Sequence, residues 1–403
     1  MVQFEEDVAI VVDAGSASVK AGFSGEDMPR SVLPAMAEET SVTPEERAVY
    51  KARRPESREC YLEYRTHEDM EAAQRPHPIQ RGVLKDMDEM EKLMDDVFNF
   101  ELAVYPDAHI PVLMTEPPLN ERAQRRDLAE LMFETFKVPA LAMANSSVLA
   151  LFASGRTRGL ALESGAGVTH AVPIYEGFAL NHAVLTLYGA GQDVTHRLKK
   201  MLAERGHNLE LDTVRDIKEK LCYVPGSGRG AGAGADARGE DQYELPDGST
   251  IHVDDQCRSQ AAELLFDPKG MGEPYRSQAL DGGVASMVVR SIDMCDKHLT
   301  KDLFENVVLA GGGTMMPGFV ERVKEEVRAA SNPAAGASPL GGAAAANIIP
   351  HPTVHEPGYT SQRRHAAWTG GSIIASLSTF SQIQVTKQEY EDTGESTVHR
   401  KCL

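Results

Sequence analysis

The chain has 403 residues, and its 60 acidic and 41 basic side chains give a formal net charge of −19. This length predicts two or three lobes rather than one small core. The acidic balance argues against direct binding to nucleic acid, whose phosphates attract basic surfaces. No apolar run in the sequence approaches the roughly 20 residues that span a bilayer, so we expect no membrane association.

The termini and the cysteines predict an intracellular protein without a lipid anchor. Residues 1–7 are acidic where a signal or transit peptide would be basic. Cys402 stands second from the end, whereas a prenylation box needs a cysteine fourth from the end. Five scattered cysteines without a CxxC pair are typical of reduced thiols in the cytosol or nucleus.

Segments with strand and helix character alternate along the chain, which predicts an α/β fold. Residues 8–13 and 111–116 are rich in β-branched and small apolar side chains and are predicted strands. Residues 121–136 carry apolar side chains at helical spacing, so we expect a helix that buries one face. Residues 306–310 are a further predicted strand. After three glycines, a helix is expected over 317–329, with a proline in its first turn.

Three stretches lack this periodicity and are predicted to be surface loops. Residues 36–76 are crowded with charges of both signs, residues 225–238 are a Gly- and Ala-rich low-complexity run, and residues 330–358 are rich in Ala, Gly and Pro. None of the three offers enough apolar area to form a core of its own.

A weak internal repeat places one feature at two points about 150 residues apart. One apolar strand ends in Asp13 and a turn of Gly, Ser and Ala, and another ends in Glu163 and a similar turn. Each continues as a second strand, which predicts a hairpin whose glycines permit a tight turn. Backbone N–H groups of such turns can bind a polyphosphate. Lys20 could add a charge, and Asp13 could hold Mg²⁺ through water.

Each hairpin taken alone is more often an ordinary turn, and neither has the GxxxxGK[ST] or GxGxxG spacing. A third cluster, residues 311–314, joins a strand to a helix where a base or ribose could pack on bare backbone. Together the three clusters favour a nucleotide cleft between two related lobes. They do not separate a kinase, a chaperone ATPase and a filament protein.

Several longer segments carry a resemblance to a known family. They are residues 113–120, 133–136, 172–177, 216–223, 243–248, 368–380, 387–390 and 398–403. In these segments the sequence resembles actin and the actin-related proteins, and the agreement extends to the last residue. The resemblance implies the α/β actin-like ATPase fold, with two related lobes, four subdomains and ATP in the cleft between the lobes.

The same resemblance implies subdomain boundaries. Subdomain 1 takes residues 1–35, 77–153 and 368–403, and subdomain 2 takes the charged segment 36–76. Subdomain 3 takes residues 154–190 and 280–367 with the insertion 330–358, and subdomain 4 takes residues 191–279 with the loop 225–238.

Most positions that bind the nucleotide in the family are retained, and Arg364 stands where the family has a lysine. The implied nucleotide- and phosphate-binding residues are Gly15, Ser16, Lys20, Gly165, Gly167, Val168, Lys218, Glu219, Gly311, Gly312 and Arg364. Asp13 is the implied metal-binding carboxylate, acting through water, and Glu163 stands at the position of a second one.

The phosphate loops and the hydrolytic positions depart from the family pattern. Ala17 stands where actin has glycine, Glu163 where it has aspartate, and Ala166 where it has a second aspartate. The glutamine that positions the attacking water aligns with Ser146, whereas its partner His170 is retained. Hydrolysis needs an in-line water and a neutralised γ-phosphate, and losing one positioning group typically costs about 100-fold in rate.

We therefore expect a protein that binds ATP or ADP, with Mg²⁺ binding weakened or lost, and that is at most a slow ATPase. One alternative is that neighbouring residues compensate and the ATPase is intact. Another is that the metal and γ-phosphate sites are lost and the cleft holds ADP or nothing.

Two regions that join subunits in actin filaments have changed. Residues 38–64 correspond to a loop with an apolar tip in actin and are loaded with charge here, and residues 267–272 retain one large apolar side chain. Apolar area drives such docking at about 25 cal/mol per Å². The expected partners are other actin or actin-related subunits and the proteins of a cytoskeletal, axonemal or nuclear complex. The alternatives are a conventional filament-forming actin ATPase of divergent sequence and, in a third class, a sugar-kinase-like or chaperone-like enzyme.

Overall fold

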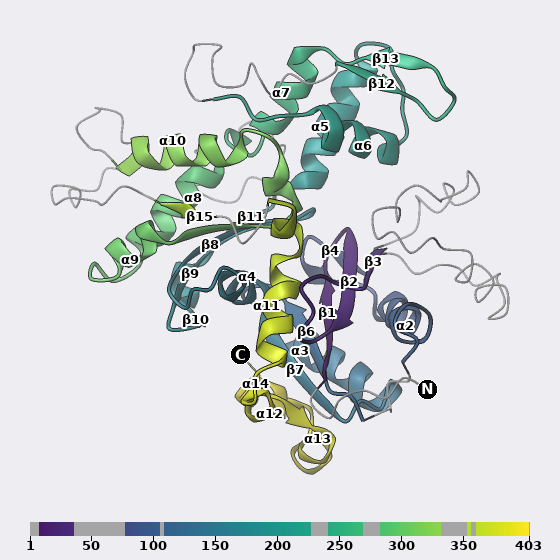
Figure 1. Cartoon of the computed structure of the whole chain (residues 1–403), viewed down its shortest axis with the longest axis vertical. Helices are drawn as coiled ribbons and strands as arrows, with labels where there is room; N and C mark the ends of the chain where they lie inside the picture. Colours follow the sequence, from purple (N-terminus) through teal and green to yellow (C-terminus); the bar gives the residue numbers. More distant parts are fainter. Residues whose placement is uncertain are drawn as a thin grey trace. The chain divides into compact units, whose positions relative to one another are not determined.

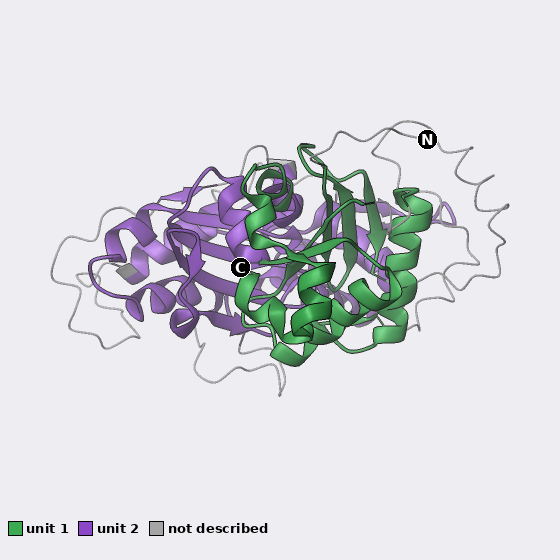
Figure 2. Cartoon of the chain, turned by 90° about the horizontal axis from the view of Figure 1, so that it is seen from below, with its two compact units in different colours: residues 1–144, 371–403 green, residues 145–370 purple. Residues whose placement is uncertain are grey.

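The computed structural model describes residues 8–35, 77–104, 109–226, 241–268, 283–331, 353–355 and 360–402. Helices and strands alternate through these ranges, as the sequence predicts (Figure 1). The chain divides into two compact units (Figure 2). Unit 1 comprises Met1–Ala144 and Gly371–Leu403, and unit 2 comprises Asn145–Gly370. The boundaries of four subdomains within them stay a prediction.

Unit 1 is built on a six-stranded sheet in the order β16-β7-β6-β1-β2-β3. Its strands are β1 Ile10–Ala14, β2 Ser18–Phe23, β3 Ser31–Pro34, β6 Val112–Glu116, β7 Ala140–Asn145 and β16 Val385–Thr386. In the middle of the sheet, β1 pairs parallel with β6 and antiparallel with β2. Residues 10–12 of β1 are fully buried. A strand covered on both faces is a continuous apolar run, which is why this segment is recognisable in the sequence.

The other elements of unit 1 are mostly helical. They are the hairpin β4 Ile79–Gln80 and β5 Val83–Leu84, and the helices α2 Met87–Asp95, η2 Asp96–Glu101, α3 Arg122–Glu130, η3 Leu131–Thr135, α12 Phe380–Ile383, α13 Lys387–Thr393, η9 Glu395–Thr397 and α14 Val398–Lys401. The helix α11 Ala366–Ala375 runs across the second boundary between the units. Phe98, Met132 and Phe133 belong to the core that these elements enclose.

Unit 2 contains the second six-stranded sheet, in which β10-β9-β8-β14-β15 follow one another and β11 also pairs with β9. Its strands are β8 Gly159–Ser164, β9 Thr169–Tyr175, β10 Phe178–Ala179, β11 Leu185–Leu187, β14 Val307–Ala310 and β15 Val354–His355. A separate hairpin is formed by β12 Gln242–Glu244 and β13 Thr250–His252.

The helices of unit 2 enclose a core that includes Phe304, Leu309 and Phe319. They are α4 Ser146–Ala153, η4 Asn181–Ala183, α5 Gly191–Ala203, α6 Leu211–Leu221, α7 Asp255–Glu263, α8 Gly283–Asp293, α9 Thr300–Glu305, η6 Gly312–Met315, α10 Phe319–Ser331 and η8 Thr360–His365. The helix α5 packs against α6 and α7, and α10 packs against α8.

The predicted strands 8–13, 111–116 and 306–310 are confirmed as β1, β6 and β14. The helix predicted over 121–136 is present but ends in the wide π-helical turn η3. Residues 131–133 are three successive buried apolar residues. All three belong to the core of unit 1, where the wider π-helical turn buries them together.

The prediction that Pro317 lies in the first turn of a helix is wrong. The chain makes the 3-10 turn η6, and α10 begins only at Phe319. The intervening Gly318 has φ +83°, and a Cβ there would lie 2.2 Å from the carbonyl oxygen of Val224. The N–H of Val224 donates to the carbonyl of Pro317 at 2.8 Å. Close approach of a neighbouring segment therefore fixes this turn.

Of the three predicted loops, residues 36–76 lie outside the described residues, as do 227–238 of the second. The loop prediction for 330–358 is wrong at Val354–His355, which form β15 and pair parallel with β14. Val354 is buried and belongs to the core of unit 2. Apart from residues 330, 331 and 353, the remainder of that stretch lies outside the description. Among the described helices, none is both long and apolar enough to cross a bilayer.

Candidate functional site

The predicted repeat is present as two hairpins with the same register, one in each unit. Asp13 of β1 lies opposite Lys20 of β2, and Glu163 of β8 lies opposite His170 of β9. In both hairpins the acidic residue and the basic residue opposite it are seven positions apart (20 − 13 and 170 − 163). The turns are closed alike, because Gly15 donates to the carbonyl of Ser18 at 3.1 Å and Gly165 to that of Val168 at 3.0 Å.

The first hairpin holds its carboxylate between two donors. Asp13 is buried at the end of β1, where its Oδ2 accepts from Lys20 Nζ at 2.9 Å and its Oδ1 accepts from Thr115 Oγ1 at 2.7 Å. Thr115 comes from β6, the parallel neighbour of β1. In the turn, Ser16 Oγ accepts from the N–H of Gly82 at 3.2 Å. Lys20 therefore neutralises Asp13 in this structure.

The second hairpin holds its longer carboxylate differently. Glu163 Oε2 accepts from Ser146 Oγ at 2.8 Å and from Ser147 Oγ at 2.7 Å. The two serines are the first residues of α4, whose N-terminus is capped by the side chain of Asn145. Ser146, predicted to stand where a glutamine would position water, thus donates to Glu163 instead. Ser147 was not predicted as a site residue, although its hydroxyl beside Ser146 at a helix start was the available signal.

The turn of the second hairpin also contacts the first residues of α5. The N–H of Gly191 donates to the carbonyl of Gly165 at 3.1 Å, and the N–H of Gln192 to that of Ala166 at 2.8 Å. Ala166 is half-buried and carries no polar side chain, so the turn accepts these two hydrogen bonds at its backbone carbonyls. Gly191 is a second participant that the sequence pattern did not single out.

His170 is buried beside this turn. Its Nδ1 lies 3.0 Å from Thr186 Oγ1, and its Nε2 has no protein partner among the residues described. Burial lowers the pKa of His170 to about 4, so its ring is neutral near pH 7. A neutral imidazole can accept a proton or a hydrogen bond at one nitrogen.

The third glycine cluster packs directly on the second hairpin. Gly311 has φ +87°, and a Cβ on it would lie 2.3 Å from the carbonyl oxygen of Ser164. A Cβ on Gly313 would lie 2.6 Å from Ser164 Oγ. A Cβ on Gly312 would meet nothing within 4 Å. Packing therefore requires glycine at 311 and 313, whereas position 312 has room for a side chain.

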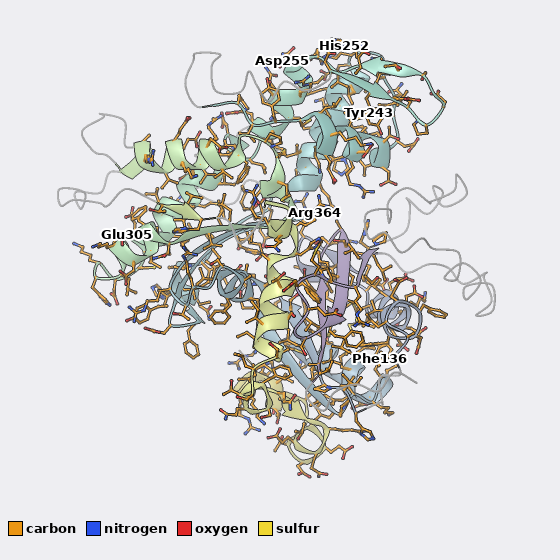
Figure 3. All side chains as sticks on the ribbon, viewed as in Figure 1. Phe136, Tyr243, His252, Asp255, Glu305 and Arg364 are labelled. Atoms are coloured by element: carbon orange, nitrogen blue, oxygen red, sulfur yellow. The ribbon has the colours of Figure 1, made fainter. Side chains whose placement is uncertain are left out.

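Two further predicted site residues are basic: Lys218 lies in α6 and Arg364 in η8. Lys218 Nζ donates to the carbonyl of Gly191 at 3.1 Å, and burial lowers the pKa of Lys218. The neighbouring Glu219 is exposed and raises that pKa through its charge. Arg364 is exposed at the end of η8 (Figure 3). The backbone carbonyl of the preceding residue, Arg363, accepts from the N–H of Gly311 at 2.9 Å.

Unit 2 thus brings together most of its predicted site residues. Gly165, Lys218 and Gly311 are joined through Gly191 and Ser164, and Gly167 and Val168 complete the turn of the same hairpin. Unit 1 brings together Asp13, Lys20, Gly15 and Ser16 in the turn between β1 and β2.

The family model described as Actin matches residues 4–403. The chain therefore belongs to the actin family, and the resemblance is confirmed over nearly its whole length. Its mixed α/β architecture is that of the actin-like ATPase fold.

The family implies a hydrated Mg²⁺, and the positions implied for it, taken in each unit by itself, do not fit it. Of the three carboxylate positions, Asp13 is bound by Lys20 and Thr115, Glu163 is bound by two serines, and the third is Ala166. Within the described ranges, no cluster of three or more His, Cys, Asp or Glu side chains could hold a metal ion.

Proposed function

We propose that this actin-family protein binds an adenine nucleotide, ATP or ADP, and hydrolyses ATP very slowly. We propose further that it acts as a structural subunit of a cytoskeletal or other multiprotein assembly. The observation that carries the first proposal is the Ser146 side chain, which donates to Glu163 at 2.8 Å where the family has a water-positioning amide.

Nucleotide binding is supported by the retained backbone geometry. Both hairpins keep tight turns in which a glycine N–H closes the loop, at Gly15 and at Gly165. Turns of this kind present N–H groups to anions. The Gly311–Gly313 backbone and Lys218 lie against the second turn. These groups would bind the nucleotide through backbone N–H groups and charge. The substitutions at the hydrolytic positions should therefore affect nucleotide binding less than hydrolysis.

Slow hydrolysis is supported by the hydrolytic groups. His170 is present and neutral, but a serine hydroxyl committed to Glu163 cannot hold the attacking water as an amide would. Ala166 offers no carboxylate near the second turn. Each missing positioning group is expected to cost about 100-fold in rate.

A single-turnover assay tests this proposal. Purified protein is loaded with radiolabelled ATP, and phosphate release is followed. We expect bound ATP to persist for much longer than it does in filament actin. The double variant Ser146→Gln with Ala166→Asp should raise the rate by about tenfold or more. Ser154→Ala, at the other end of α4, is the matched control and should leave the rate unchanged. Hydrolysis by the wild type as fast as that of filament actin would contradict the proposal.

The proposed partners are other actin or actin-related subunits and the proteins of a cytoskeletal, axonemal or nuclear complex, with no direct contact to nucleic acid or membrane. The proposed compartment is the cytoplasm, with cytoskeletal association. What supports these proposals is membership of the actin family together with the changed filament segments. Asp267 is described, whereas residues 38–64 and 269–272 lie outside the description.

A further inference from the structure

The acidic side chains that would meet a hydrated Mg²⁺ are bound by the protein's own donors. We infer that adenine nucleotide binds to this protein without a divalent cation, because two serines of α4 and a lysine of β2 occupy the carboxylates instead. This inference rests on the nucleotide binding proposed above. It names a property of that site which the family match does not supply.

The contacts of Glu163 are the first step. A carboxylate oxygen has about two lone-pair positions for acceptance. Oε2 of Glu163 accepts two hydroxyl hydrogen bonds, at 2.8 Å from Ser146 and 2.7 Å from Ser147. Mg²⁺ keeps several waters and binds carboxylates directly or through those waters. An ion that bound Oε2 directly would have to displace at least one of these two serine donors.

The two serines are held in place by the fold. Ser147 is fully buried and Ser146 is 8% exposed. Both lie in the first turn of α4, where Asn145 Oδ1 accepts from the backbone N–H of Ser147 at 3.0 Å and of Val148 at 3.3 Å. Glutamate is one methylene longer than the aspartate of the family, and its carboxylate reaches these hydroxyls. The changes at 146 and 163 therefore form one contact rather than two separate losses.

Asp13 is the second step, and it is satisfied within unit 1. Oδ1 accepts from Thr115 at 2.7 Å, and Oδ2 forms an ion pair with Lys20 at 2.9 Å. The two side chains of this pair are only 11% and 14% exposed. A partly buried ion pair is weakly screened, so the ammonium supplies the positive charge that a cation would otherwise bring.

The experiment measures nucleotide affinity rather than turnover. The nucleotide-free full-length protein is titrated calorimetrically with ADP, and separately with ATP, in Mg²⁺ and in EDTA. We expect the dissociation constants in the two buffers to agree within about threefold. Binding that weakens about tenfold or more in EDTA would overturn the inference while leaving the proposed nucleotide binding intact. No binding of either nucleotide in either buffer would overturn the proposed function and, with it, this inference.

Variants test the role of the serines. Ser146→Ala with Ser147→Ala removes both donors to Glu163, and we expect affinity in EDTA to fall about tenfold relative to Mg²⁺. Glu163→Asp keeps the charge but shortens the side chain, and its affinity should likewise be about tenfold weaker in EDTA than in Mg²⁺. This variant provides the test if the double serine variant does not fold. Ser154→Ala is the control, since its hydroxyl donates to the carbonyl of Leu151 within the same helix end and not to Glu163. An unchanged ratio of affinities in both test variants would overturn the role assigned to the serines.

Discussion

Burial, rather than a neighbouring charge, sets the protonation of His170. Its pKa of about 4 lies below the ordinary value of 6.5, and desolvation is the cause. The unfolded chain therefore binds a proton between these values while the folded chain does not. Stability is complete above the unfolded pKa and is lost as the pH falls toward the folded one. Between about pH 7 and pH 5 this one group should remove about 2 kcal/mol from the free energy of unfolding.

The measurement is urea unfolding at several pH values for the wild type and for His170→Gln, which cannot be protonated. The variant should lose less stability on acidification, by about 2 kcal/mol at pH 5. The exposed His182, changed to Gln, is the control and should follow the wild type. Parallel pH profiles for the wild type and His170→Gln would show that His170 titrates normally.

Gly311 and Gly312 are neighbours but differ in the space available for a side chain. Gly311 is left-handed, and a Cβ would collide with the carbonyl oxygen of Ser164 at 2.3 Å, whereas Gly312 has open space. Gly311→Ala should therefore lower the free energy of unfolding by about 2 kcal/mol or more, because neither the φ nor the backbone contact can relax cheaply. Gly312→Ala should change it by less than about 0.5 kcal/mol. Chemical denaturation of both variants checks this, and equal losses would contradict the packing described.

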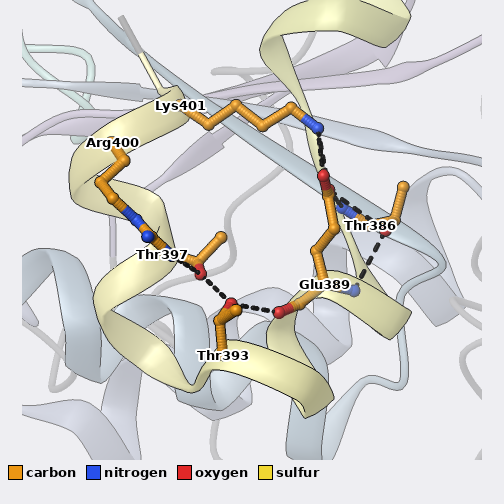
Figure 4. Close-up of polar contacts among 6 residues, drawn as sticks. All are labelled: Thr386, Glu389, Thr393, Thr397, Arg400 and Lys401. Atoms are coloured by element: carbon orange, nitrogen blue, oxygen red, sulfur yellow. Dashed lines mark hydrogen bonds and ion pairs between the residues drawn. The ribbon is translucent and has the colours of Figure 1, made fainter.

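At the scale of elements, the C-terminal helices are joined by side chains around Glu389 (Figure 4). Glu389 and Thr386 form a capping box at the start of α13, with 2.8 Å from the N–H of Thr386 to Oε2 and 3.2 Å from the N–H of Glu389 to Oγ1. Lys401 Nζ donates to both oxygens of Glu389, at 2.7 and 2.8 Å, and this contact is the main reason why the pKa of Glu389 is lowered. The ring of Tyr390 stacks on Phe133 of the unit 1 core, with centroids 4.5 Å apart.

This network predicts the effect of removing the cap. Thr386→Ala should cost about 1 kcal/mol, the usual value of an N-cap hydroxyl, and should raise hydrogen exchange in α13 more than elsewhere in unit 1. Hydrogen–deuterium exchange read by mass spectrometry measures this. Ser376→Ala is the comparison, because the exposed Ser376 hydroxyl donates to the carbonyl of Ile373 three residues before it. Unchanged exchange in α13 would mean that packing through Tyr390 alone holds the helix.

The elements show which signals the sequence contains. The two hairpins could be predicted because buried strands followed by a carboxylate and a glycine turn leave a local pattern, and their register bears this out. The turn at Gly318 and the π-helical end of α3 could not, since each is set by a segment distant in sequence or by core packing. The Glu163 contact was missed for the same reason. Glu163 and Ser146 are 17 positions apart in the sequence, and the packing of α4 against β8 brings them together.

At the scale of the whole molecule, family membership over residues 4–403 establishes the fold, and the surface charge bears on assembly. A formal charge of −19 opposes self-association, and the sequence of segment 38–64 is rich in charged residues. We therefore expect the protein to stay in the supernatant after high-speed sedimentation with Mg-ATP, under conditions in which actin pellets. Pelleting above a critical concentration would instead favour the conventional filament-forming ATPase.

The equal register of the two hairpins has a consequence for how this chain can vary. Side chains alternate between the faces of a strand, so a one-residue slip of β2 against β1, or of β9 against β8, would move Lys20 or His170 away from the carboxylate that it faces. Residues within the turns are free of that constraint, because a substitution there alters chemistry without altering spacing. Ala17 and Ala166 are both of this kind. The turns of this protein thus carry other functional groups than the family pattern, while each hairpin keeps the register that sets its carboxylate opposite Lys20 or His170.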